Sequence, residues 1–241
     1  MDGAPRDDLA TLGALAEPSR RALYDYVSSQ QTWVSREQAA DAVGIQRGIA
    51  AHHLDRLAEE GLLEVDYQRL TGRRGPGAGR PAKVYRRAAT EIELSLPPRQ
   101  YELAARLLAS AADRSRGDGT PIDQALTDAA RTEGRHLGEQ SRERLGRRSS
   151  TRARQEGLFA ELRTLGFEPE TLADDVTVLH NCPFHHLARE HTDLICGMNL
   201  CLLESLLTEL AGTGLRAALE PAEGSCCVRF HPSLASNAKT A

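Results

Sequence analysis

Aromatic residues are scarce in this 241-residue sequence, of which they make up 4%. That scarcity leaves little material for a large aromatic ligand pocket and favours helices whose cores consist of leucine and alanine. No apolar run approaches the roughly 18 to 20 residues of a membrane span, and the acidic N-terminus has no apolar signal-peptide segment. We therefore expect a cytoplasmic protein that does not enter a membrane.

The common catalytic motifs are also missing. The sequence contains no GxSxG, HExxH or P-loop motif. Its glycine-rich stretch, residues 71–81, follows an expected strand without opening a helix, so it is not a dinucleotide-binding fingerprint. We predict that the protein is not an enzyme.

Length and cysteine positions predict how the chain is divided. At about 150 residues per domain, 241 residues correspond to two modest domains or one elaborated domain. All five cysteines lie after residue 180. In a reducing compartment we expect them to be free, metal-bound or redox-active rather than paired in disulfides.

The first 90 residues have the pattern of short helices followed by two strands. Ser35 and Gln38 form a capping box, and Gly44 and Gly61 each end a helical pattern. The expected elements are helices over 9–16, 18–27 and 36–43, a helix around 49–57, and strands over 62–65 and 83–86. This order is that of a winged helix-turn-helix, in which a basic loop separates the two strands.

The helix around residues 49–57 is the one we expect in the DNA major groove, because the second helix of a helix-turn-helix lies there. Ile49, Leu54 and Leu57 are expected to face the core. The side chains left for base readout are Gln46, Arg47, His52 and Arg56. Glutamine can bond bidentately to adenine and arginine to guanine, which suits that role.

A basic run follows this helix. Between Tyr67 and Thr90 the sequence has seven basic residues and no acidic one, although the net charge of the chain is −4. Such a run attracts a polyanion. The residues predicted to bind DNA are Arg73, Arg74, Arg80 and Lys83, and the rest of the run consists of Arg69, Arg86 and Arg87. We expect Arg86 and Arg87 to make phosphate contacts that position the protein.

Three motifs in this region resemble the ArsR-type winged-helix regulators. They are residues 12–21 (LGALAEPSRR), residues 53–57 with 60–63 (HLDRL and EGLL), and residues 79–85 (GRPAKVY). The motifs fall in the same order as in that family and span about the first 90 residues. The resemblance implies a winged-helix domain that binds double-stranded DNA.

Helices predominate again beyond residue 95. The expected elements are helices over 97–116, 122–145, 151–165 and 194–210, a strand over 176–180, and a hairpin of 215–219 with 226–230. We assign an apolar stripe to the dimer contact, although it equally suits an intramolecular core; it comprises Tyr101, Leu103, Leu107 and Leu108.

These patterns predict a mostly α fold with small β (α+β), divided into three segments. The segments are a winged helix-turn-helix DNA-binding domain at 1–90, a helical linker and dimerisation segment at 91–165, and a cysteine-rich domain of α+β type at 166–241.

Two cysteines are expected near helix starts. Cys182 precedes Pro183, a favoured first residue of a helix, and Cys196 follows the cap-like Thr192. Helix N-termini stabilise thiolates, and thiolates bind metals and iron–sulfur clusters. Both residues are therefore candidate ligands.

The other cysteines have different expected roles. Cys226 and Cys227 are placed on a strand, where neighbouring side chains face opposite sides, so only one of them should join a given site. Cys201 is flanked by leucines and is expected to be a small core residue. Possible nitrogen ligands near Cys182 are His185, His186 and His191.

The cysteine spacing does not match the CxxC pairs of a zinc ribbon. Residues 181–185 (NCPFH), Cys196 and residues 224–227 (GSCC) are, however, similar to the SufR-like iron–sulfur repressors, whose N-terminal half is the same winged helix. That resemblance implies a 4Fe-4S or 2Fe-2S cluster held mainly by cysteines, and so implies that the segment 166–241 is an iron–sulfur sensor domain. Its fourth ligand stays open between the doubled cysteine and a histidine such as His185.

Together these features favour a homodimeric repressor that binds a pseudopalindromic DNA operator and senses iron or redox status through the cluster. One alternative is a winged-helix regulator that responds to a small organic ligand or to zinc. The other is a thiol redox enzyme, although the CxxC motif that such enzymes usually use is absent from the sequence.

Overall fold

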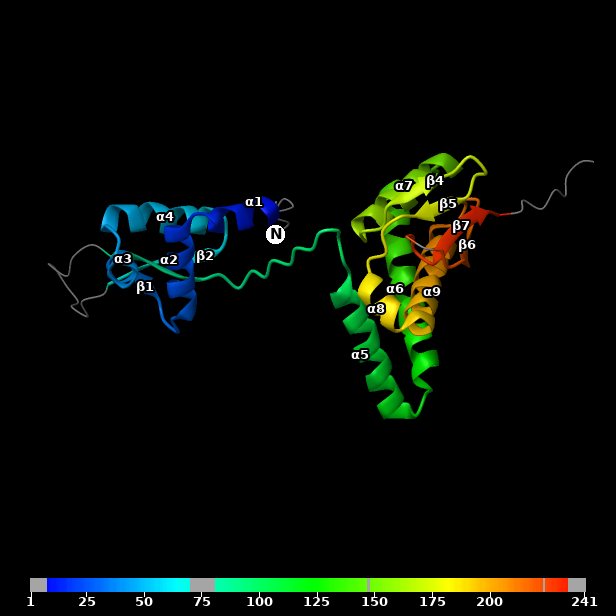
Figure 1. Cartoon of the computed structure of the whole chain (residues 1–241), viewed down its shortest axis with the longest axis horizontal. Helices are drawn as coiled ribbons and strands as arrows, with labels where there is room; N and C mark the ends of the chain where they lie inside the picture. Colours follow the sequence, from blue (N-terminus) through cyan, green and yellow to red (C-terminus); the bar gives the residue numbers. More distant parts are fainter. Residues whose placement is uncertain (1–7, 70–80, 147, 223, 234–241) are drawn as a thin grey trace, which may run out of the picture. The chain divides into compact units, whose positions relative to one another are not determined.

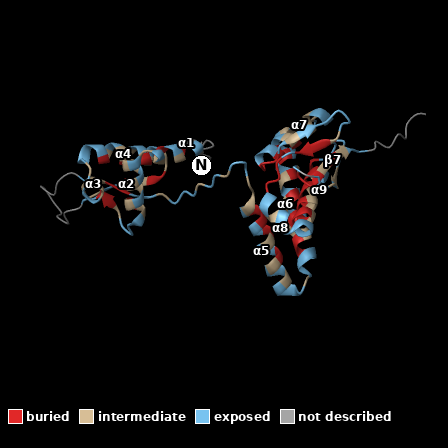
Figure 2. Cartoon of the chain, in the orientation of Figure 1, coloured by how far each residue is buried: buried red, intermediate tan, exposed pale blue. Residues whose placement is uncertain are grey.

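The computed structural model describes residues 8–69, 81–146, 148–222 and 224–233. The chain forms two compact units, Met1–Leu94 and Ser95–Ala241, each with its own buried core (Figures 1 and 2). Both units combine helices with a small antiparallel sheet, which confirms the expected α+β class. The helical segment 91–165 and the cysteine-rich segment 166–241 share the core of the second unit.

The first unit begins with helices and ends with a pair of strands. Its described elements are α1 (Asp8–Gly13), a 3₁₀ turn (Ala14–Ala16), α2 (Pro18–Ser29), β1 (Val34–Ser35), α3 (Arg36–Val43), α4 (Arg47–Glu59), β2 (Leu63–Gln68) and β3 (Ala82–Arg87). The sheet order is β1-β3-β2, with both pairs antiparallel. The central strand β3 thus connects the short β1 to β2.

Local sequence signals determine where these helices begin and end. The Glu17 carboxylate caps α2 by accepting two backbone N–H bonds, at 3.0 and 2.6 Å. Ser35 and Gln38 form the predicted capping box of α3. Gly44 ends α3 with φ of 73°, a left-handed conformation that glycine adopts without strain. The chain can therefore turn at once into α4.

The buried face of α4 differs from the prediction at one residue. Ala50, Leu54 and Leu57 are fully buried, whereas Ile49 is 46% exposed. Residues 50, 54 and 57 follow the spacing of one helix face, and Ile49 lies about 100° from Ala50 around the helix. The prediction that Ile49 faces the core is therefore wrong, and its side chain belongs to the exposed face.

The second unit is built around two long helices. Its described elements are α5 (Tyr101–Asp118), α6 (Ile122–Leu145), α7 (Thr151–Thr164), β4 (Pro169–Thr171), β5 (Thr177–Leu179), α8 (His185–Glu190), α9 (Thr192–Leu210), β6 (Leu215–Leu219) and β7 (Val228–Pro232). The antiparallel sheet has the order β4-β5-β7-β6. Helices α6 and α9 run side by side (Figure 1). No helix in the described part of the chain is long and apolar enough to cross a membrane.

The close approach of α6 and α9 depends on two buried glycines of α6. A Cβ atom added at Gly134 would lie 2.1 Å from the Leu202 carbonyl oxygen, and one at Gly138 would lie 2.9 Å from that of Leu206. Only glycine lets the two backbones approach this closely. The contact holds α9, the helix that carries Cys196, against the centre of the unit.

The apolar stripe of α5 lies inside the protomer. Leu103 and Leu107 are buried in the core of the second unit, and Leu108 packs against that core. Since α5 packs on α6, Leu103 and Leu107 belong to the intramolecular core, which is the alternative that the sequence left open. The prediction that these two leucines form a dimer contact is therefore wrong, whereas Tyr101 and Leu108 are only partly buried. Helical periodicity shows which face is covered, but not whether the covering surface belongs to the same chain.

Candidate functional site

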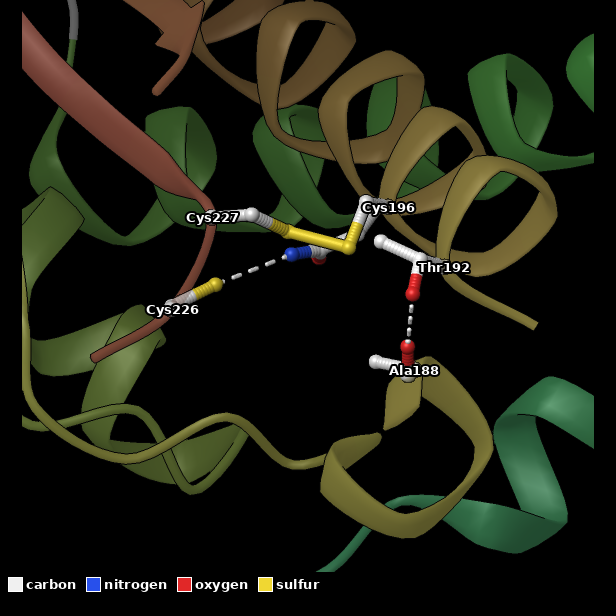
Figure 3. The surroundings of a disulfide bond; sticks show 6 residues. Ala188, Thr192, Cys196, Cys226 and Cys227 are labelled. Carbon is white, nitrogen blue, oxygen red and sulfur yellow. Dashed lines mark hydrogen bonds between the residues drawn. A yellow bond between two sulfur atoms is a disulfide. The ribbon is translucent and has the colours of Figure 1, made fainter. Parts of the chain in front are cut away.

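Four of the five cysteines meet at one cavity in the second unit. Cys182, Cys196, Cys226 and Cys227 line a space of about 380 Å³. They come from three separate segments, namely the loop before α8, the second turn of α9 and the segment that leads into β7. Figure 3 shows Cys226 and Cys227 as neighbours on one segment, with Cys196 on the adjacent helix. The fold thus brings together all the cysteines that we predicted as candidate ligands.

Both members of the Cys226–Cys227 pair reach this cavity, which contradicts the prediction that only one would do so. The two residues precede β7, which begins at Val228, and therefore lie outside the strand. The alternation of side chains across a strand does not apply to them. An irregular backbone before a strand is what allows two adjacent cysteines to serve one site.

Cys196 and Cys227 form a disulfide, with their Cα atoms 6.3 Å apart (Figure 3). The expectation that the cysteines are unpaired is wrong for these two residues. They are 31 residues apart in the sequence, so only the tertiary fold reveals the pairing. Cys182, Cys201 and Cys226 are free thiols.

The positions of Cys182 and Cys196 relative to helices are only partly as predicted. Helix α9 begins at Thr192, so this residue is not a cap, and its hydroxyl donates to the Ala188 carbonyl at 2.8 Å (Figure 3). Cys196 consequently lies in the second turn of α9. Cys182 precedes α8 and its sulfur accepts a hydrogen bond from the Phe184 backbone N–H, as expected near a helix start.

The thiols of Cys182 and Cys226 are hydrogen-bonded to each other. The bond from Cys226, aided by the Phe184 backbone N–H and the Arg99 guanidinium, lowers the pKa of Cys182 to about 7 against the opposing effect of burial. The same bond, together with burial, raises the pKa of the Cys226 thiol above its ordinary value. Above pH 7 the pair therefore consists of a Cys182 thiolate and a protonated Cys226 that donates to it.

Asn199 lies one turn beyond Cys196 on α9 and is 1% exposed. Its amide nitrogen donates to the Cys226 sulfur at 3.3 Å, and its side-chain oxygen has no hydrogen-bond partner among the described residues. Burying an unsatisfied polar atom is costly, which indicates that this side chain is retained for its contact with the sulfur. Sequence reasoning missed Asn199, although a single asparagine within the apolar run 194–203 was a usable signal.

His185 is the histidine that lines the cavity. Burial, followed by the positive charge of Arg99, lowers its pKa and favours the neutral imidazole that binds metals. His186 and His191 are not part of the cavity lining. Cys201 packs against the core and also lies outside that lining, in keeping with its predicted role.

The donor set suits an iron–sulfur cluster, because cysteine thiolates are the usual ligands of such clusters. No group of three or more Cys, His, Asp or Glu among the described residues is placed to hold a single metal ion. A cluster distributes its thiolates over several iron atoms, so its ligands surround a volume and need not converge on one point. Cys196 and Cys227 can act as ligands only after their disulfide has been reduced, since each sulfur is used in that bond.

The side chains that we predicted for base readout lie along α4 or, in the case of Gln46, at its N-cap. These side chains are Gln46, Arg47, His52 and Arg56, all of them exposed. The two arginines pair with nearby carboxylates, Glu37 on α3 and Glu60 just beyond α4. Ion pairs this exposed contribute little stability, so the arginines can exchange them for contacts with DNA. Ile49 adds an apolar group to the same helix.

Lys83, also predicted to bind DNA, has an internal partner. Its ammonium group lies 2.6 Å from the Asp55 carboxylate, and its side chain is 20% exposed. Asp55 also accepts a hydrogen bond from the Tyr85 hydroxyl and pairs with Arg36. Burial alone would raise the pKa of Asp55, but the bonds from Lys83 and Tyr85 lower it. This network joins α3, α4 and β3, so we do not count Lys83 in the DNA surface proposed below.

The predicted loop residues Arg73, Arg74 and Arg80 lie outside the described residues. Two other members of the basic run, Arg69 and Arg87, are exposed beside the strands. Arg86 pairs with Glu64, and its guanidinium lies 4.5 Å from the centre of the Trp33 ring. Arg86 therefore also holds the sheet together.

Comparison of the chain with protein-family models and with curated proteins finds no match. The cysteine cavity and the exposed side chains of α4 are therefore the features of the molecule that indicate a function.

In metal-free protein we expect the rate of Cys182 alkylation to rise with pH around a midpoint of about 7. The thiolate is the reactive form, so the rate should level off above that pH. Cys226→Ala removes the stabilising hydrogen bond and should shift the midpoint up toward the ordinary value of about 8.5. Iodoacetamide labelling quantified by mass spectrometry measures both profiles. Identical profiles in the two proteins would contradict the described bond.

Proposed function

We propose that this protein is a homodimeric transcription regulator whose affinity for operator DNA is set by an iron–sulfur cluster held in the cysteine cavity. The observation that carries the proposal is the convergence of Cys182, Cys196, Cys226 and Cys227 from three chain segments on one cavity. The Cys196–Cys227 disulfide explains why two of these residues lie together but not why Cys182 and Cys226 join them, whereas the ligands of one cluster would all lie around one volume.

The first unit supports the DNA-binding part of the proposal. Its order of α2, α3, α4, β2 and β3 is the one expected of a winged helix-turn-helix, whose second helix enters the major groove. Polar side chains cover the exposed face of α4. Ile49 on that helix is suited to contact a thymine methyl group, which is read by apolar side chains.

The second unit supports the cluster part. An iron–sulfur cluster, when bound, supplies a redox-active centre. Cys182, Cys196, Cys226 and Cys227 would hold it, and His185 stands close enough to the cavity to replace one thiolate. A cysteine must be deprotonated before it can bind a metal. Because the pKa of Cys182 is lowered, a larger fraction of this thiol is already deprotonated at neutral pH.

Anaerobic purification followed by an absorbance spectrum tests this proposal. We expect a brown protein that contains iron and acid-labile sulfide. A colourless protein that contains zinc, or one that contains neither metal, would contradict the cluster and favour the regulator that responds to zinc or to a small organic ligand.

A thiol redox enzyme is the second candidate, and one observation favours it. The Cys196–Cys227 disulfide lies in the same cavity as the Cys182 thiolate, so the cavity holds both partners of thiol–disulfide exchange. Turnover of a disulfide substrate by the protein, in the presence of a thiol reductant, would support this activity. An absence of turnover together with a bound cluster would support the regulator.

On the DNA side, Arg47→Ala and His52→Ala are expected to relax sequence preference, because base contacts specify and phosphate contacts position. Each should cost about 1 to 3 kcal/mol at one base position. The double variant Arg73→Ala with Arg74→Ala should weaken binding to all DNA and reduce the salt slope by about 1 for each phosphate that is no longer neutralised.

Titration of a selected operator and of an unrelated duplex at several salt concentrations separates these effects. Unchanged affinity and salt slope in the double variant would contradict the assignment of the basic loop to DNA.

A further inference from the structure

The segment that joins the two units is bonded to the loop that carries Cys182. This segment, residues 95–100, is called the connector below; it follows Leu94, the last residue of the first unit, and leads into α5. The Arg99 guanidinium donates to the Cys182 carbonyl and to the Asn181 side-chain oxygen, both at 2.7 Å. The Gln100 backbone N–H donates to the Pro183 carbonyl at 3.1 Å. Three consecutive residues of the cysteine loop are thus tied to the connector.

Asn181 secures the same contact from the cysteine loop. Its side chain is buried, and its amide nitrogen donates to the carbonyl oxygens of Pro98 at 3.1 Å and Gly166 at 2.5 Å. The oxygen of this amide accepts a hydrogen bond from Arg99 of the connector. Both polar atoms of the Asn181 side chain therefore have partners in the connector, and the nitrogen has a second partner in Gly166. A Cβ added at Gly166 would lie 2.8 Å from Pro98, so no larger residue fits there. The contact is therefore a close-packed and fully hydrogen-bonded one.

Only a short stretch of chain separates this contact from a residue of the first unit's core. Ile92 packs against that core, and the Ser95 hydroxyl accepts a hydrogen bond from the Arg99 backbone N–H at 2.7 Å. Residues 93 and 94 alone separate these two anchored residues, and such a span is at most about 11 Å of extended chain. If the Cys182 loop moves, residues 93 and 94 are therefore the short stretch that can change conformation between these two anchored residues.

We propose that Arg99 and Asn181 are positioning residues that couple the state of the cysteine site to the DNA-binding unit through the connector. The inference rests on the proposed function, since it states how a cluster at Cys182 would alter DNA binding. A ligated Cys182 must adopt the geometry that the cluster requires, and the hydrogen bonds pass that geometry to residues 98–100. Coupling of this kind requires contacts that differ between the cluster-containing and cluster-free states, and in this proposal the bonds of Arg99 and Asn181 are those contacts.

The test compares full-length wild-type and Arg99→Ala proteins, each with and without cluster, under anaerobic conditions. The probe is a duplex selected by the wild-type protein from random DNA. Wild-type protein should bind it about tenfold more tightly with cluster than without, a typical coupling. In Arg99→Ala this ratio should fall toward one, while the affinity of the cluster-free protein stays at its wild-type value. Iron and sulfide content, measured on the same samples, shows whether each variant carries the cluster.

Arg154→Ala is the matched control. The Arg154 guanidinium also bonds backbone carbonyls of the second unit, those of Leu210 and Ala211, but it does not contact the connector. This variant should keep the wild-type ratio. Both bonds come from the Arg99 Nη1 atom, so Arg99→Lys, whose ammonium has three N–H donors but lacks the planar guanidinium geometry, should restore part of the ratio.

A second variant keeps the test decisive if Arg99→Ala takes up no iron. Insertion of Gly-Ser-Gly-Ser between Glu93 and Leu94 leaves the cysteine site and its contacts intact but lengthens the tether. This insertion variant should bind the cluster, but its affinity for DNA should no longer differ between the cluster-containing and the cluster-free form. A wild-type ratio in this insertion variant, or in iron-loaded Arg99→Ala, overturns the proposal. Failure of the proposed function itself is distinct, because the wild-type protein would then lack either the cluster or any difference in affinity.

Discussion

Cys182→Ser is expected to abolish incorporation of the iron–sulfur cluster, and Cys196→Ser should do the same. Serine keeps the size of the side chain but offers a poor ligand for iron in place of a soft thiolate. Both cysteines line the cavity, whereas Cys201 does not. Cys201→Ser should therefore take up iron and sulfide as the wild-type protein does, which makes it the matched control for the loss of a thiol.

Iron and sulfide analysis after anaerobic reconstitution measures these effects. The same series resolves the fourth ligand. With four cysteine ligands, Cys226→Ser and Cys227→Ser both lose the cluster and His185→Ala keeps it. If His185→Ala instead loses the cluster and one of the two cysteine variants keeps it, His185 is the fourth ligand. Full occupancy in Cys182→Ser would remove Cys182 from the site and contradict the central role given to its loop.

Gly134→Ala is expected to destabilise the second unit by about 3 kcal/mol, the upper end of the usual cost of overpacking. The new Cβ would lie 2.1 Å from the Leu202 carbonyl oxygen and 2.9 Å from the Ser205 Cβ. A backbone oxygen can give way only if α6 and α9 move apart. This cost outweighs the gain of about 1 kcal/mol that alanine brings to a helix interior.

Gly197→Ala is the control within the same helix pair, because a Cβ there meets nothing within 4 Å. That variant should be as stable as the wild-type protein or slightly more stable. Urea unfolding followed by circular dichroism reports on the helices of both units, while fluorescence of Trp33, the single tryptophan, reports on the first unit alone. The fluorescence midpoint should stay unchanged. A wild-type circular dichroism midpoint for Gly134→Ala would contradict the described closeness of α6 and α9.

The helix boundaries of the first unit could be predicted because their signals are local. The capping box at Ser35 and the left-handed Gly44 act within a few residues, so sequence alone locates α3. The buried face of α4 was predicted less well. Both Ile49 and its neighbour Ala50 are apolar, and only the packing of the surrounding helices decides which of them is covered.

The cysteine site was predicted in its composition but not in its geometry. The chemistry of thiols identified Cys182 and Cys196 as candidate ligands without knowledge of the fold. The disulfide with Cys227 and the Asn199 contact depend on side chains brought together from distant segments. The bond between Arg99 and Cys182 spans 83 residues, and no local pattern encodes a contact of that range.

The proposed control of DNA binding has a physical basis in how the candidate ligands are distributed. Because they come from three segments, a cluster closes long chain loops and should order the second unit. In a two-fold dimer the recognition helices must lie about one DNA turn apart, roughly 34 to 36 Å. A small change in geometry therefore alters the fraction of protein able to bind, and a tenfold effect requires only about 1.4 kcal/mol of coupling.

Control of DNA binding by the cluster is tested by the affinity of cluster-containing and cluster-free wild-type protein for one operator duplex. Both forms are measured anaerobically at a single salt concentration, because binding to DNA depends strongly on salt. We expect binding about tenfold tighter with the cluster than without it, the direction that the SufR-like resemblance implies. Equal affinities would show that a bound cluster is structural and does not control DNA binding.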